Sequence, residues 1–148
     1  MEDYSIFACV DFWKDIKKLN IKSSFLECNI SREEFKKLST SEKIFAVPIL
    51  RQISNAIKNK FRALNEIPNN NRNGQQPFLS SDWILWKMRW AVDNRGARYG
   101  LRIIYSVNGS HIVFSTIKHK KEIAKKETLF QQEAIERFKI FFACKDIE

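Results

Sequence analysis

The sequence predicts an α+β fold in which N-terminal helices pack on a small twisted antiparallel sheet and a further helix lies at the C-terminus. Three patterns predict it. Apolar residues recur at helical spacing over 49–64, alternate with polar residues over 83–118, and return to helical spacing over 130–141. The length of 148 residues and the apolar content of 44% indicate one globular domain that spans 1–148.

One short strand and one short helix are predicted at the N-terminus. Residues 4–10 form an apolar, β-prone run, and Asp11 after them is a residue type that caps helices. The helix that follows is expected to bury a face made of Phe12, Ile16 and Leu19.

The region 20–80 is predicted to be enlarged and helical. Two short helices in it begin at pairs with the spacing of a capping box, in which the two side chains satisfy backbone N–H groups reciprocally. These pairs are Ser31 with Glu34 and Ser39 with Glu42. Pro48 suits the first turn of a longer helix that is expected to reach Leu64, and the Asn-rich stretch 68–77 is expected to be a loop.

Residues 83–121 are predicted to form a basic three-stranded meander. In its first strand Trp86 and Met88 alternate with Lys87 and Arg89, so the two pairs should leave opposite faces of the sheet. The two cations therefore share one face.

The remaining strands of the meander are joined by a strong turn signal. Asn108-Gly109 favours a tight hairpin, after which 110–118 returns as the third strand. Trp83, where the meander begins, is expected either to be exposed or to meet a partner.

A C-terminal helix is predicted over 128–143. Thr128 and Gln131 have capping-box spacing at its start. The buried face is expected to carry Phe130, Ala134, Phe138 and Phe141. This helix needs an apolar surface to dock on, and the sheet is the simplest one.

Positive charge is concentrated in one part of the chain. Residues 84–126 hold ten basic and two acidic residues, so this segment carries +8 of the net charge of +9. A sheet that gathers its cations in this way is suited to bind a polyanion such as nucleic acid.

Several classes of protein and site are disfavoured. The three cysteines lack metal-ligand spacing and the chain has two histidines, so we expect reduced thiols, no metal and no small-molecule cofactor. The N-terminus is acidic and its apolar run is short, which does not suit a signal peptide. With no apolar run near about 20 residues, we expect a cytoplasmic protein without membrane contact.

The basic groups could converge on one side of the sheet. Lys87 and Arg89 leave one face of the first strand, and Arg102 lies in the next strand. Attack of a ribose 2′-hydroxyl on the adjacent phosphate needs a base, an acid and cations, but no metal. The alternative is that these cations bind phosphate and do no chemistry. Further RNA-binding candidates are Arg95, Arg98, Tyr99, Lys118 and Lys125, with Tyr99 suited to stack on a base.

The residues of the meander resemble the RelE/ParE toxin superfamily over about 83–123. The resemblance rests on Trp86-Lys87-Met88-Arg89, a basic loop, Gly100-Leu101-Arg102-Ile103-Ile104-Tyr105, and Ile112-Val113-Phe114 running into Lys118-His119-Lys120-Lys121. It implies a RelE-like fold. Members similar to RelE or HigB are toxins of type II toxin–antitoxin systems that cut mRNA on the ribosome without a metal.

The resemblance also implies roles for individual residues. Lys87 and Arg89 match the two basic positions of the family's second strand, although Arg89 stands where a lysine base is expected and arginine is a poor base. Arg102 matches the arginine that stabilises the transition state. Lys120 or Lys121 matches the residue that protonates the leaving group, a role that His119 could take instead. The C-terminal tyrosine that stacks on the substrate base has no counterpart here.

The implied partners are a cognate antitoxin, mRNA and the ribosome with its rRNA. The expected function is a metal-independent, ribosome-dependent mRNA endoribonuclease. Two alternatives stay open on the same fold, namely a ParE-like inhibitor of DNA gyrase and an RNA-binding module that has lost catalysis.

Overall fold

The computed structural model describes residues 5–19, 21, 25–59, 64–66, 83–92, 100–123 and 125–144, with the backbone alone for 64–66 and 144. In chain order the elements are β1 (Ser5–Ala8), α1 (Phe12–Lys18), α2 (Arg32–Lys36), α3 (Thr40–Ala46), α4 (Pro48–Lys58), β2 (Leu64–Glu66), β3 (Ile84–Trp90), β4 (Leu101–Asn108), β5 (His111–His119), α5 (Lys120–Ile123) and α6 (Glu127–Cys144). The predicted loop 68–77 lies outside the described residues.

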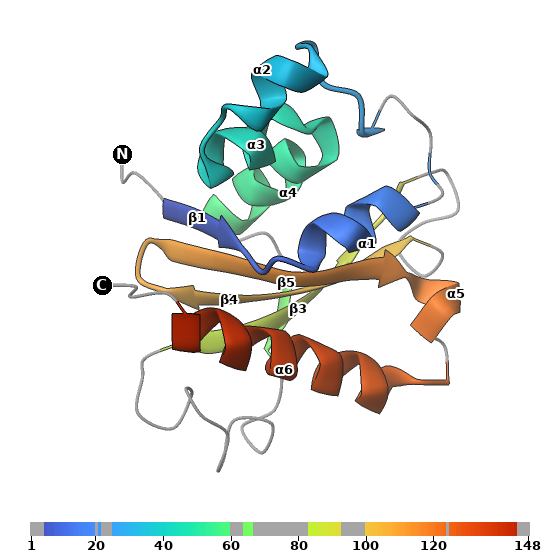
Figure 1. Ribbon diagram of the computed structural model, residues 1–148. Helices are drawn as coiled ribbons and strands as arrows, with labels where there is room; N and C mark the ends of the chain where they lie inside the picture. The colour runs from blue at the N-terminus through green and yellow to red at the C-terminus, as the bar shows by residue number, and fades with distance from the viewer. Residues whose placement is uncertain are drawn as a thin grey trace.

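The strands form one sheet in the order β1-β5-β4-β3-β2, with β2 a three-residue strand at one edge. β3, β4 and β5 pair antiparallel in sequence order, which confirms the predicted meander (Figure 1). β4 turns into β5 at Gly109, whose φ of 59° is the left-handed conformation that the Asn-Gly signal predicts.

The sheet is mixed, so the prediction of an antiparallel sheet is wrong. β1 runs parallel to β5, with Ile6 opposite Ile112 and Ala8 opposite Phe114. Parallel neighbours need a long crossover, and here the helices α1 to α4 and the strands β2 to β4 all lie between β1 and β5. Alternation within one short strand carries no information about the direction of a distant partner.

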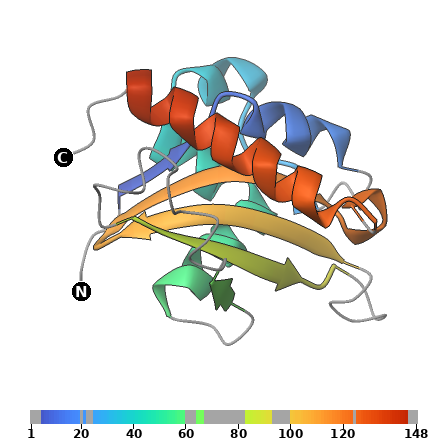
Figure 2. The same ribbon diagram turned by 90° about the horizontal axis from the view of Figure 1, so that it is seen from below.

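Helices cover both faces of the sheet. Figure 1 shows α1, α3 and α4 on one side and α6 on the other, and Figure 2 shows α6 running across its face. The first layer buries a core that includes Phe12, Ile53 and Tyr105. The second layer buries a separate core that includes Ile104 and Phe138. The protein is therefore α+β, with N-terminal helices and a C-terminal helix as predicted.

The longest N-terminal helix is shorter than predicted. Ile49, Ile53 and Ile57 are buried along one face of α4, as the spacing indicates. The helix ends at Lys58, and Leu64 belongs to β2 instead. The pattern continues past Lys58 by chance, because a strand also places apolar residues at some helical positions. The region 20–80 thus contains a strand as well as helices.

Two of the three predicted capping boxes cap helices. Ser39 and Glu42 form the full reciprocal box at the start of α3. Ser31 accepts a hydrogen bond from the backbone N–H of Glu34 at the start of α2. The third prediction is wrong, because α6 begins at Glu127 and Thr128 already lies inside its first turn.

Two further side chains differ from expectation. Asp11 occupies the N-cap position of α1 but makes no capping hydrogen bond, and its carboxylate lies 3.2 Å from Lys14 Nζ. Trp83 is buried rather than exposed, with its ring 4.9 Å from the ring of Phe142 on α6. α6 itself supplies the partner that Trp83 needs.

Candidate nucleic-acid interface

A row of three cations crosses the sheet. Arg89 on β3 lies opposite Arg102 on β4, and Arg102 lies opposite Lys118 on β5. Directly opposed residues share a face, and this face is the one that α6 covers. Like charges in direct opposition destabilise a sheet. Acidic side chains from another part of the chain would reduce the repulsion within this row.

Helix α6 supplies that negative charge. Lys87 Nζ donates a hydrogen bond of 2.5 Å to Glu127 Oε1 at the start of the helix. Two turns further on, Glu133 Oε1 lies 3.3 Å from Lys118 Nζ. The helix therefore places carboxylates against two cations of this face. We call Lys87, Arg89, Arg102 and Glu127 the basic cluster.

Arg102 is the buried centre of the basic cluster. It is 4% exposed, and its Nη1 donates a 3.0 Å hydrogen bond to the carbonyl oxygen of Leu101. Burial lowers the pKa of Arg102, the charge of Arg89 lowers it further, and Glu127 opposes both effects. These causes show that all three groups are close enough to act on one another.

The edge of the basic cluster reaches solvent. Arg89 is exposed, while the side chains of Lys87 and Glu127 keep 24% and 40% of their surface accessible. Lys121 and Lys125, which follow β5, are exposed as well, and Lys120 is half-buried. Arg89 is therefore the member of the basic cluster that is most open to a phosphate, whereas Arg102 is buried.

His119 does not belong to this group. It lies opposite Leu101, one position away from the Arg102–Lys118 pair, so its side chain leaves the other face of the sheet. It is 9% exposed, and its backbone N–H donates to Glu122 Oε1. The structure thus separates His119 from Lys87, Arg89 and Arg102, with which the sequence had grouped it.

Lys120 begins α5 where β5 ends. Its backbone N–H donates a 2.9 Å hydrogen bond to the carbonyl oxygen of Gly100, so α5 starts beside the first residues of β4. This contact brings Lys120 and Lys121 to the same end of the sheet as Arg102. The predicted RNA-binding residues Arg95, Arg98 and Tyr99 lie outside the described residues.

The acidic half of this interface was not predicted from the sequence. Glu127 and Glu133 belong to a helix whose charged residues have ordinary solvated spacing, such as the i,i+4 pair of Glu133 with Arg137. The excess of positive charge on one face of the strands could have predicted them. Such an excess favours carboxylates on the element that packs against that face.

The arrangement of the basic cluster can bind and polarise a phosphodiester. Arg89 and Lys87 can donate hydrogen bonds to phosphate oxygens, and Arg102 adds positive charge behind them. Glu127 is a carboxylate within reach of the same space, and a carboxylate can accept a proton. Among the described residues, no three His, Cys, Asp or Glu side chains gather as metal ligands would.

No helix in the described part of the chain combines the length and apolar character needed to cross a membrane. Comparisons with protein-family models, with curated proteins and with solved structures find no match to this chain.

Proposed function

We propose that the protein is a metal-independent endoribonuclease that binds RNA at the basic cluster, as its resemblance to RelE- and HigB-like toxins implies. One observation carries the proposal. Two arginines oppose each other across β3 and β4, and the neighbouring lysine contacts a carboxylate, all on one face. This set combines phosphate binding, charge stabilisation and a proton acceptor.

In the proposed reaction the ribose 2′-oxygen attacks the adjacent phosphorus while the bond to the 5′-oxygen breaks. Glu127 takes the proton of the 2′-hydroxyl, a role that arginine performs poorly. Arg89, Lys87 and Arg102 offset the charge that develops on the phosphate. Lys120 or Lys121 gives a proton to the departing 5′-oxygen. The products are a 2′,3′-cyclic phosphate and a 5′-hydroxyl.

The test is cleavage of end-labelled mRNA in EDTA, alone and during translation on ribosomes, with the product ends identified. Arg89→Gln and Glu127→Gln should each lower the cleavage rate by about 10² or more, the size of one general-base or charge-stabilising group. Arg51→Gln and Glu136→Gln remove the same charges from exposed sites on α4 and α6 and should cleave normally. Equal activity of Glu127→Gln and Glu136→Gln would contradict the assigned base.

The RNA-binding module without catalysis has one observation in its favour. Lys87, the lysine available at the site, is already held by Glu127. If the protein is such a module, RNA should bind at the basic cluster and stay intact in the cleavage experiment, both alone and during translation on ribosomes. Intact RNA together with a DNA-damage response on expression would instead favour gyrase inhibition.

A toxin of this kind acts on ribosome-bound mRNA and is held inactive by a cognate antitoxin. Growth arrest on expression of the wild-type chain, relieved by Arg89→Gln, tests the toxin role. Cleavage that occurs only during translation tests the dependence on the ribosome.

A further inference from the structure

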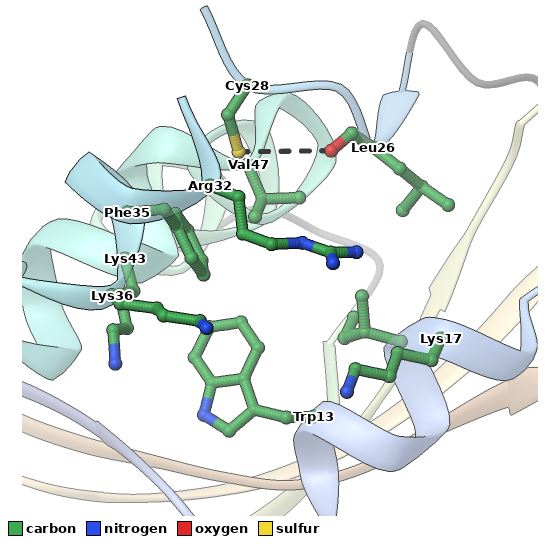
Figure 3. Close-up of a pocket in the computed structure, with 10 residues that line it drawn as sticks. Trp13, Lys17, Leu26, Cys28, Arg32, Phe35, Lys36, Lys43 and Val47 are labelled. Carbon is green, nitrogen blue, oxygen red and sulfur yellow. Dashed lines mark hydrogen bonds between the residues drawn. The ribbon is translucent and has the colours of Figure 1, made fainter. Parts of the chain in front are cut away.

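A pocket of about 590 Å³ lies among the N-terminal helices (Figure 3). These helices are on the opposite side of the sheet from α6 (Figure 1). Its volume falls in the range of sites that hold small molecules, which is about 300–1,000 Å³. It is built by α1, α2, α3 and the segment 26–28, so most of its walls come from the enlarged region 20–80.

The walls of the pocket are apolar and largely aromatic. Trp13 and Phe35 stand edge to face, with ring centroids 6.3 Å apart and planes at 83°. Ile16, Leu26 and Val47 complete the apolar lining. Both aromatic side chains are only half-buried, so part of each ring remains available. Such rings provide a stacking surface for a flat apolar group.

The charged residues of the lining all have the same sign. Lys17, Arg32, Lys36 and Lys43 line the pocket, and the described residues of the lining include no acidic side chain. Lys43 lies over the Phe35 ring at 5.8 Å. In Figure 3 Arg32 and Lys17 reach toward the same space from α2 and α1, and Lys36 lies beside the Trp13 ring.

This charge has no counterpart within the described structure. Lys87 and Lys118, on the far side of the sheet, have carboxylates against them. The described residues provide no carboxylate within 4.0 Å for Lys17, Arg32 or Lys36, all of which are exposed. Cations of one sign around a pocket raise the local positive potential and attract an anion to it.

We propose that this pocket binds a small planar aromatic anion, in which the ring stacks on one of the two aromatic side chains, Trp13 or Phe35, and meets the other edge to face, while a phosphate or carboxylate meets Arg32, Lys36 and Lys17. Arginine suits either group because its planar fork donates two parallel hydrogen bonds. The inference is independent of the proposed ribonuclease function, which uses the other face of the sheet.

The test is calorimetric titration of the full chain with four probes, namely AMP, indole-3-acetate, adenosine and inorganic phosphate. AMP or indole-3-acetate should bind with a Kd below about 1 mM, and the tighter of the two identifies phosphate or carboxylate as the preferred anion. Adenosine and inorganic phosphate each lack one half of the ligand and should bind at least about tenfold more weakly.

Matched variants locate the site. Arg32→Gln and Lys36→Gln should each weaken binding about tenfold, the usual effect of losing a charge-assisted hydrogen bond. Lys37→Gln and Lys18→Gln remove neighbouring exposed charges that do not line the pocket and should change the Kd less than about twofold. The proposal is overturned if neither aromatic anion binds, if adenosine or phosphate binds equally well, or if Lys37→Gln matches Lys36→Gln.

Discussion

Asp15 on α1 and Arg137 on α6 form an ion pair with 2.6 Å between Oδ2 and Nη1, although their helices cover opposite faces of the sheet. The pair is possible because β1 pairs with β5 only as far as Phe114. Beyond that point β5 has an open edge, and side chains from both layers can meet around it.

The same two residues satisfy the backbone at that edge. Asp15 Oδ2 accepts a hydrogen bond from the N–H of Ile117 at 3.3 Å, and Arg137 Nη1 donates to the carbonyl of Ser115 at 2.9 Å. An open strand edge is a site of unwanted pairing with other chains. Asp15 and Arg137 therefore protect the edge as well as joining the two layers.

Asp15→Asn should lower the free energy of unfolding by about 3 kcal/mol, because the buried Asp15 carboxylate is the main partner of Arg137 and also lies 3.4 Å from Lys118 Nζ. Asp15 is 3% exposed. Urea unfolding checks the value. Asp11→Asn breaks an exposed pair with Lys14 and should cost less than about 1 kcal/mol. Similar losses of unfolding free energy in the two variants would show that the Asp15–Arg137 pair stabilises the fold no more than an exposed ion pair does.

Gly100→Ala should destabilise the meander by about 2 kcal/mol or more. A Cβ at Gly100 would stand 2.0 Å from the carbonyl oxygen of Trp90 and 2.9 Å from its carbon. Both are backbone atoms, so β3 and β4 would have to separate. Thermal unfolding measures the loss.

The control for that variant is Gly109→Asn, since nothing lies within 4 Å of a Cβ there and asparagine tolerates positive φ. It should cost less than about 1 kcal/mol. If the two glycine variants lost equal stability, backbone flexibility rather than close approach would explain Gly100.

Stability should fall as the pH rises from 9 to 12. Burial raises the pKa of the Cys9 thiol from 9.0 to about 12. The unfolded chain then releases this proton at lower pH than the folded protein does. The stability that the protonated thiol contributes is fully present below pH 9 and is lost toward pH 12. Burial also raises the pKa of Tyr105, which acts in the same direction.

Cys9→Ser tests this assignment because a serine hydroxyl does not ionise in that range. Denaturant unfolding at several pH values between 9 and 12 should show a shallower decline than in the wild type. Cys28→Ser alters a half-buried thiol and should flatten the decline less. An unchanged slope in Cys9→Ser would assign the alkaline loss to other groups.

RNA binding should separate the roles of Arg89 and Glu127. Arg89→Gln should lower the log–log salt slope of binding to single strands by about 0.7, the loss of one phosphate contact. Glu127→Gln should bind RNA more tightly than the wild type, since it removes negative charge beside Lys87 and Arg102, and yet cleave it more slowly. Filter binding across a salt series measures both effects.

Two outcomes would contradict these separate roles of Arg89 and Glu127. If Arg51→Gln changed the slope as much as Arg89→Gln, the RNA would be held by net charge and not by the basic cluster. If Glu127→Gln bound RNA more weakly than Glu136→Gln, Glu127 would serve to position Lys87 and not to compete with phosphate.

Local patterns predicted the elements well. The alternation around Lys87 and Arg89 placed both on one face, and the Asn108-Gly109 turn fixed the pairing of β4 with β5. The spacing of Phe130 and Phe138 gave the buried side of α6. These features depend on neighbours within a few residues, which a single sequence displays.

The contacts between distant elements could not be predicted in this way. The parallel pairing of β1, the burial of Trp83 and the carboxylate of Glu127 beside Lys87 each depend on where another element docks. His119 was grouped with Arg102 through the resemblance to the toxin superfamily, and only the register assigns them to opposite faces.

The parallel pairing of β1 with β5 has a consequence for the order of folding. Ile6 meets Ile112 across roughly a hundred residues of chain, and such distant pairing closes slowly because a long loop must be ordered first. The meander and α6 involve mostly local contacts and can form earlier. During synthesis the first strand must therefore stay unpaired until β5 has emerged from the ribosome, and Asp15 can meet Arg137 only after α6 has been made.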